Sequence, residues 1–254
     1  MKLRVLGASG AEVPGYGLSS FLLDGTVLFD AGSVTQALTL SEQKRIKDIF
    51  ITHSHLDHIR DIAFLADNLV LDNHNTTINI YGLDETIAAI KSHILNNTIW
   101  PDFSRIPSKD NPLLRFIPVT PLKEVIVKDY RVLPLPANHT VPAVGYLVGS
   151  REGTFVYTGD TGPSEALWDA LKGRTLDVMI IEVSFPDEMR EMAEKTGHLC
   201  PSLLKEGIDS SGILCNKLLI SHIKPQYEDK ILTQLQGIKG YSIEVLDSPR
   251  VIEI

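Results

Sequence analysis

The stretch His53-Ser54-His55-Leu56-Asp57-His58 places three imidazoles and one carboxylate within six residues. It follows an apolar run that ends at Thr52 and is typical of a buried strand. If the extended backbone continues, the first two histidines project to the same side, because side chains alternate along a strand. A turn into a helix then directs the aspartate and the last histidine toward a second point nearby. The spacing predicts two neighbouring metal sites, since zinc-like cations accept imidazole nitrogen and carboxylate oxygen.

Length and composition predict a soluble globular protein. The chain has 254 residues, of which 43% are hydrophobic and 22% are charged, so we expect one domain over residues 1–254. No apolar run reaches the roughly 18 residues that a membrane span needs, and the N-terminus lacks the apolar core of a secretory signal. Cys200 and Cys215 form no CxxC pair, which favours a reducing compartment and therefore the cytoplasm.

The charge balance argues against a long nucleic acid as partner. The formal net charge is −8, and the longest basic cluster, Lys44-Arg45-Ile46-Lys47, lies between Glu42 and Asp48 like an ordinary solvated helix face. A protein that binds a polyanion usually presents a basic surface to the phosphates. A small anionic substrate stays compatible with this charge, because two bound dications would cancel part of it locally.

The start of the chain, Leu3 to Ala11, has the glycines of a dinucleotide-binding loop but no helix after them. Two strand-like runs around Asp24-Gly25 predict a β-hairpin there instead. Residues 97–121 are rich in proline and predict a long ordered loop. Helices are expected at 33–47, 59–71, 83–96, 164–172, 186–195, 201–210 and 228–236. Strands are expected at 78–82, 130–135, 144–148, 154–158, 178–181 and 218–220, with a closing strand at 243–246. Hairpins mixed with helices in two similar halves predict an α+β fold, with packed sheets and helices outside.

Three further metal ligands each follow a strand-like run: His139, Asp160 and His222. Gly159 frees the backbone to turn the Asp160 carboxylate inward. A single residue of this kind is more often structural, but three in equivalent positions beside the histidine cluster favour ligands.

The ligands divide into two sets. The first metal is assigned to His53, His55 and His139, the second to Asp57, His58 and His222, with Asp160 and a hydroxide bridging. Each ion keeps a position for solvent, as a catalytic site requires. Asp30, at the end of another strand-like run, either orients a ligand imidazole or is a turn residue before glycine, and both interpretations stay open.

These segments resemble the metallo-β-lactamase superfamily over essentially the whole chain. The resemblance is carried by the histidine motif, the Thr158-Gly159-Asp160 turn and Ser221-His222. It implies a four-layer αββα sandwich with a dinuclear site, usually of zinc, at one edge of the sheets.

A closer resemblance is to the class II cyclic-nucleotide phosphodiesterases. It rests on the segments Thr52–Ile59, Ile80–Leu83, Asn97–Phe103, Gly197–Pro201 and Ser221–Pro225. The chain departs from the family pattern at Asp61, where a small residue is usual. Asp61 removes no ligand but changes packing or charge beside the site.

His198 is the candidate general acid. It lies in a loop, and Glu182, at the end of a strand, can accept a hydrogen bond from it and favour the imidazolium. A loop histidine is by itself more often an ordinary surface residue. The resemblance implies more, because related tRNA 3′-end processing endonucleases use such a Glu and His pair to protonate the leaving group. His74 and His93 are expected to be structural or exposed.

The expected function is metal-dependent hydrolysis of a 3′,5′-cyclic nucleotide, cyclic AMP first, to the 5′-monophosphate. The bridging hydroxide attacks phosphorus, Asp57 also orients it, and His198 protonates the departing 3′ oxygen. The cofactors are two divalent ions, zinc being expected and manganese the alternative. The expected partner is a small nucleotide rather than a membrane, and a homodimer is compatible with the sequence. No base-reading residue is identified. The proline-rich region with Asn97 and Trp100 is a candidate cover for the nucleotide, and a tryptophan there can stack on a base, but a tryptophan that is buried or at a subunit contact is the more frequent case.

Other functions fit part of the pattern. An RNA-processing endonuclease of the same superfamily would need a basic arm that this acidic chain lacks. A metal- or nucleotide-binding module without turnover does not need a general acid. The metal motif alone also permits hydrolysis of thioesters or lactams.

Overall fold

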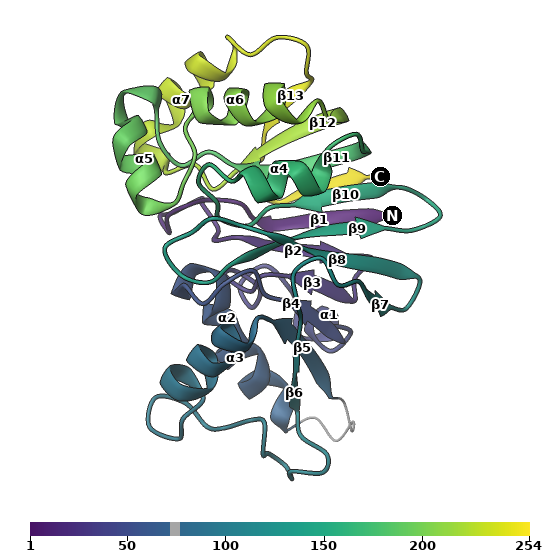
Figure 1. Cartoon of the computed structure of the whole chain (residues 1–254). Coiled ribbons are helices and arrows are strands. Elements are labelled where there is room, and N and C mark those ends of the chain that lie inside the picture. Colours follow the sequence, from purple (N-terminus) through teal and green to yellow (C-terminus); the bar gives the residue numbers. More distant parts are fainter. Residues whose placement is uncertain (72–76) are drawn as a thin grey trace.

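The computed structural model describes residues 1–71 and 77–254, and His74 lies outside them. Within this part of the chain, two seven-stranded sheets face each other (Figure 1). The first sheet has the strand order β14 (Arg250–Glu253), β1 (Lys2–Gly7), β2 (Ser20–Leu23), β3 (Val27–Phe29), β4 (Asp48–Phe50), β5 (Ile78–Gly82) and β6 (Leu114–Pro118). The second has the order β13 (Ile243–Val245), β12 (Leu214–Ser221), β11 (Thr175–Glu182), β10 (Thr154–Tyr157), β9 (Val144–Gly149), β8 (Tyr130–Pro136) and β7 (Val125–Val127).

Helices cover the outer face of each sheet (Figure 1). On the first sheet lie α1 (Leu40–Gln43), α2 (Leu56–Val70), and α3 (Asp84–Ala89), which continues as the π-helix η1 (Ile90–Ile94). On the second lie α4 (Glu165–Leu171), η2 (Asp187–Met189), α5 (Arg190–Thr196), α6 (Pro201–Ser211), η3 (Pro225–Tyr227) and α7 (Glu228–Leu235). None of the described helices is both long and apolar enough to cross a bilayer.

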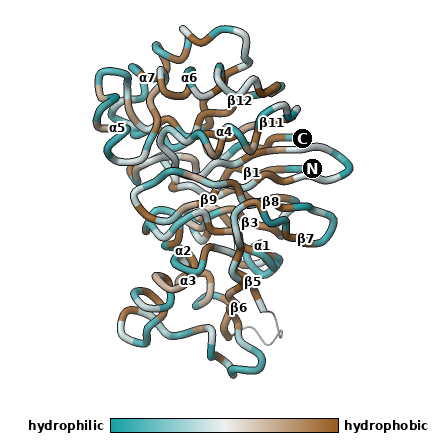
Figure 2. Tube along the Cα trace, viewed as in Figure 1, coloured by the Kyte–Doolittle hydropathy of each residue, from teal (hydrophilic) through white to brown (hydrophobic). Residues whose placement is uncertain are grey.

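Three apolar cores separate the four layers. The central one joins both sheets and contains Phe29 and Phe50 from the first and Tyr146 and Phe155 from the second. The outer two lie between each sheet and its helices. Hydrophobic residues accordingly run along the strands in the middle of the molecule, and hydrophilic ones gather on the outer turns (Figure 2). The predicted αββα sandwich is confirmed.

Parallel pairing brings the site-bearing strand ends to one edge. In the first sheet β3, β4 and β5 pair in parallel, and in the second β10, β11 and β12 do. Because carboxyl ends of parallel strands meet at the same edge, the segments that follow them converge there.

Most predicted elements are confirmed, but the helix expected over 33–47 is wrong, because only α1 is helical there. Thr39 has an extended backbone and forms a capping box with Glu42, so a new helix begins after it. The preceding turn is held by Asp61 of α2, whose carboxylate accepts hydrogen bonds from the backbone N–H groups of Val34 at 2.6 Å and Thr35 at 2.7 Å.

One loop prediction and one strand prediction also need correction. The proline-rich region contains β6, which pairs with β5 at the sheet edge, where proline is tolerated. The strand at 243–246 corresponds to β13 and does not close the fold. A further strand, β14, returns to the first sheet and pairs antiparallel with β1.

The contacts of Asp61 lead to a stability prediction. Asp61 is buried, at 1% exposure, and its carboxylate also accepts hydrogen bonds from Thr35 Oγ1 and Arg60 Nε. We expect Asp61→Ala to lower the free energy of unfolding by about 2 to 3 kcal/mol, because the buried backbone N–H of Val34 and the partly buried N–H of Thr35 lose their acceptor. The control is Asp67→Ala, on the exposed side of the same helix, which chemical denaturation should leave near the wild type. Equal effects of the two substitutions would contradict this role of Asp61.

Candidate metal centre

The histidine motif occupies the junction between β4 and α2. Residues 51–55 lie between the strand and the helix, and His55 is the N-cap of α2 with an extended backbone of φ −65° and ψ 147°. Asp57 and His58 therefore lie in the first turn of the helix, and the two halves of the motif point to different places as predicted. The Thr52 backbone N–H donates to Asp30 Oδ1 at 2.8 Å, which holds the segment between strand and helix.

The first cluster contains His53, His55, His139 and Asp160, whose candidate ligand atoms all lie within 4.8 Å of one another. His139 Nε2 lies 3.1 Å from His55 Nδ1. The Asp160 Oδ2 atom lies 3.7 Å from His53 Nε2 and 3.9 Å from His139 Nε2. These distances leave space for one cation between the four side chains.

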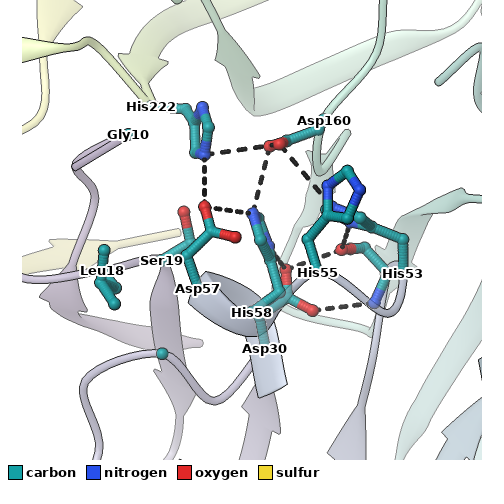
Figure 3. A network of polar contacts seen from close by, with 12 residues as sticks. Gly10, Leu18, Ser19, Asp30, His53, His55, Asp57, His58, Asp160 and His222 are labelled. Atoms are coloured by element: carbon teal, nitrogen blue, oxygen red, sulfur yellow. Dashed lines mark hydrogen bonds and ion pairs between the residues drawn. The ribbon is translucent and has the colours of Figure 1, made fainter. Parts of the chain in front are cut away.

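The second cluster contains Asp57, His58, His222 and again Asp160. Asp57 Oδ2 lies 3.2 Å from His222 Nε2 and 3.5 Å from His58 Nε2. The Asp160 carboxylate lies 3.4 Å from each of the two imidazoles. Figure 3 shows Asp160 between His222 and His58 on one side and His53 on the other. Its carboxylate is thus placed to bridge the two clusters.

The backbone at Asp160 is shaped by Gly159. Gly159 has a φ of +60°, and a Cβ atom on it would lie 2.7 Å from the Thr52 side chain. Only glycine combines this conformation with such a close approach. The loop is also tied to the loop of His139, because the Gly162 N–H donates to the Asn138 carbonyl at 2.7 Å.

Unpaired buried atoms show that this donor set fits metal ions. His53 Nε2, His58 Nε2 and Asp160 Oδ1 are buried and have no hydrogen-bond partner among the described residues. Buried polar atoms without a partner are costly, and here they converge on the two clusters. Imidazole nitrogen with carboxylate oxygen is a donor set suited to zinc and similar ions.

The pKa directions agree with this fit. Burial holds the pKa of His53 well below its usual value and also lowers the pKa of His55 and His139. A lowered pKa favours the neutral imidazole, which is the form that binds metals. Burial also opposes protonation of His58, but the carboxylates of Asp160 and Asp30 raise its pKa well above the usual value. A cation at this position would take the place of that proton.

Asp30 orients two of the imidazoles. Its Oδ2 atom lies 2.7 Å from His58 Nδ1, so of the two interpretations left open by the sequence the structure supports the first. The same oxygen accepts hydrogen bonds from Thr52 Oγ1 at 2.8 Å and Tyr157 Oη at 2.7 Å. The Thr52 hydroxyl also lies 3.0 Å from His53 Nδ1. In both imidazoles Nδ1 is therefore engaged and Nε2 faces the ligand cluster. Hydrogen bonds of this kind, from residues around the ligands, set ligand orientation in metal sites.

His139 and His222 are held in the same way from the second sheet. His139 Nδ1 donates to the Gly197 carbonyl at 2.7 Å. Ser184 Oγ lies 3.0 Å from His222 Nδ1 and donates to Glu182 Oε2 at 2.8 Å. Sequence reasoning missed Ser184, Thr52 and Tyr157 as positioning residues. Thr52 and Tyr157 lie at the ends of strand-like runs that precede predicted ligands, so their positions were a usable signal. Ser184 lies in no sequence pattern that indicates its role.

The Glu182 and His198 pair lies beside both clusters. His198 Nδ1 is 2.7 Å from Glu182 Oε1, so the predicted contact is present. The His198 ring lies 5.0 Å from the ring of His139 and 5.6 Å from that of His222. Burial acts to lower the pKa of His198, but the Glu182 carboxylate outweighs it and the net direction is upward. These two residues and His222 form a third group of possible metal donors, but the carboxylate oxygens of Glu182 already accept hydrogen bonds.

Trp100 is not part of the site. Its indole Nε1 donates to the Ala63 carbonyl of α2 at 3.1 Å, and its ring contacts Phe64 at 5.5 Å. It fixes the proline-rich region to that helix. His93 lies exposed on η1, as expected.

A family model described as a beta-lactamase superfamily domain matches residues 25–218. The chain belongs to this family. It is 29% identical to a 3′,5′-cyclic-nucleotide phosphodiesterase of Aliivibrio fischeri over 300 aligned residues, which cover 97% of this chain and 83% of the relative. It is 25% identical to a ribonuclease Z of Methanococcus maripaludis over 290 aligned residues, 90% of either chain. The crystal structure of the metallo-beta-lactamase fold protein YhfI from Bacillus subtilis superposes with a TM-score of 0.79 at 20% identity, over 99% of both chains.

The resemblance to the metallo-β-lactamase superfamily is therefore confirmed. The relatives are named for different substrates at similar identity. The similarity thus identifies a metallo-hydrolase of this superfamily and leaves the substrate to be argued from the site.

The two-cluster arrangement leads to a metal-binding prediction. We expect the wild type to bind two divalent ions per chain and His139→Ala to bind fewer, because the first cluster loses an imidazole. His93→Ala removes an exposed histidine and should leave the content unchanged. Elemental analysis after dialysis measures both, and equal metal content in all three proteins would contradict the assignment.

Chelation gives a second readout of the same prediction. A ligand present at a hundredfold excess over its Kd stabilises the fold by about 2.7 kcal/mol, so removal of the ions should lower the Tm of the wild type. The shift should be smaller in His139→Ala.

Proposed function

We propose that the protein hydrolyses a 3′,5′-cyclic nucleotide to the 5′-monophosphate, with cyclic AMP as the first substrate to test. The observation that carries the proposal is the pair of clusters sharing Asp160, with the His198–Glu182 pair next to them. Two-metal sites of this kind serve in-line displacement at phosphorus. The relative from Aliivibrio fischeri, which aligns over nearly the whole chain, is named for cyclic-nucleotide hydrolysis.

Each cluster has an assigned role in this proposal. His53, His55 and His139 would hold one ion, Asp57, His58 and His222 the other, and Asp160 both. Two bound dications, zinc or alternatively manganese, would lower the pKa of a bridging water and neutralise charge on the phosphate oxygens. The Asp57 side chain is 32% exposed, so it also faces the solvent side, where it would orient the attacking water.

His198 is assigned as the general acid. Its Nδ1 is occupied by Glu182, which leaves Nε2 to donate a proton. Attack by hydroxide, formed when the attacking water releases a proton to solvent, makes a new P–O bond and breaks the bond to the 3′ oxygen, which takes the proton from His198. Glu182 holds the imidazole in place and supports its protonated form.

The negative net charge of the chain favours a cyclic nucleotide over a long RNA as the substrate. The ribonuclease Z relative gives that alternative support, and the His198–Glu182 pair would serve it equally well. A long RNA, however, requires a basic surface, and this chain carries a formal net charge of −8.

The substrate is tested with one assay series on metal-loaded protein. Cyclic AMP, cyclic GMP, bis(p-nitrophenyl) phosphate and a precursor tRNA are compared under the same conditions, and the products are separated chromatographically. We expect turnover of a cyclic nucleotide to the 5′-monophosphate and no processing of the tRNA. Absence of turnover with both cyclic nucleotides would refute the proposal. Stoichiometric nucleotide binding without product would instead indicate a binding module.

The role of His198 gives a sharper prediction. We expect His198→Ala to lower kcat for cyclic AMP by about 100-fold or more, with unchanged metal content. Turnover of bis(p-nitrophenyl) phosphate should fall much less, because p-nitrophenolate leaves without a proton. His93→Ala is the control. Equal loss with both substrates, or loss of metal together with activity, would exclude the general-acid role.

A further inference from the structure

Lys224 lies on the rim of the metal centre with its charge unpaired. It follows His222 by two residues and precedes η3. Its ammonium group contacts the Gly10 carbonyl at 3.4 Å and lies 5.5 Å from the centre of the Phe185 ring. No carboxylate of the described residues forms an ion pair with it.

Both contacts lead directly to residues of the site. The Phe185 ring meets the His198 imidazole edge-on, with centroids 5.8 Å apart. Gly10 lies against His222, because a Cβ atom on Gly10 would be 2.5 Å from the His222 carbonyl oxygen and 3.0 Å from Nδ1. The Gly10 N–H also donates to the carbonyl of Ile223 at 3.0 Å, which fixes this close approach.

Lys224 differs in this respect from two arginines of the described residues. Arg60 forms ion pairs with Glu12 and Asp61, and Arg190 with Glu194 and Glu206. An ammonium group has three N–H donors, and one carbonyl and one ring face do not neutralise its charge. Lys224 thus retains donor capacity beside a site whose proposed substrate is an anion.

We propose that Lys224 binds a non-bridging oxygen of the substrate phosphate, on the side of the site formed by His198 and His222. The phosphate is taken from the proposed function, on which the inference rests. The Gly10 carbonyl and the Phe185 ring hold the ammonium group in position before the substrate arrives, so little side-chain freedom is lost on binding. A charge-assisted contact of this kind is stronger than a neutral one.

The test compares three substitutions in metal-loaded protein. Lys224→Gln removes the charge, Lys224→Arg keeps it, and Lys230→Gln makes the same change of net charge at an exposed lysine of α7. Inorganic phosphate is the probe, titrated calorimetrically, and KM and kcat are measured with cyclic AMP. Metal content and Tm are recorded for every variant.

We expect Lys224→Gln to weaken phosphate binding by about tenfold and to raise KM by a similar factor. The value of kcat should change much less, because a contact made in both ground and transition states affects mainly KM. Lys224→Arg should retain most of the affinity, and Lys230→Gln all of it. Wild-type phosphate affinity in Lys224→Gln, or an equal loss in Lys230→Gln, would overturn the proposal. A lower metal content or a lower Tm in Lys224→Gln would also overturn the proposal, because Lys224 would then stabilise the structure rather than bind phosphate.

The two proposals fail in distinguishable ways. If the wild type hydrolyses neither cyclic nucleotide but Lys224→Gln still loses phosphate affinity, the proposed function is wrong and the phosphate contact is supported. If cyclic AMP is hydrolysed and Lys224→Gln matches the wild type in phosphate affinity and KM, the phosphate contact is wrong.

Discussion

The buried carboxylate of Asp30 is the interaction on which the rest of the site depends. It is fully buried and accepts hydrogen bonds from the Thr52 backbone and hydroxyl, from His58 and from Tyr157. Thr52 and His58 belong to the first sheet and its helix, whereas Tyr157 ends a strand of the second sheet. One side chain therefore joins the two sheets and aims an imidazole at the metal centre. Its own φ of 55° lies in the left-handed region, a strained conformation that such a network maintains.

The ligand histidines are oriented toward the metal centre by hydrogen bonds to their other ring nitrogen. On His53, His58, His139 and His222 one ring nitrogen is engaged by the protein, so the other is left for the cluster. Three buried atoms of the two clusters, His53 Nε2, His58 Nε2 and Asp160 Oδ1, have no hydrogen-bond partner among the described residues. The fold thus tolerates polar atoms that water cannot reach, and metal ions are the natural way to satisfy them. His222, like Asp30, has a positive φ, of 58°, so two of the non-glycine residues with a left-handed backbone lie at the site.

Both ligand clusters and the layered fold could be predicted from the sequence, because the patterns that indicate them lie within short stretches of the chain. The spacing of the histidine motif and the position of His139, Asp160 and His222 after strand-like runs were enough to assemble both clusters, and the paired halves gave the sandwich. What failed depends on contacts between distant residues. The turn before Thr39 is held by Asp61, β6 exists because β5 offers it an edge, and β14 because β1 does. Ser184 likewise has no sequence signal, since its role comes only from lying between Glu182 and His222.

The most direct test of a dinuclear centre bridged by Asp160 is anomalous X-ray diffraction from metal-loaded crystals, recorded at the absorption edge of the ion. We expect two peaks about 3.5 to 4 Å apart. One should lie among His53, His55 and His139, the other among Asp57, His58 and His222, with Asp160 touching both. A single peak, or a peak between Glu182 and His198 in place of either, would contradict the two-metal assignment.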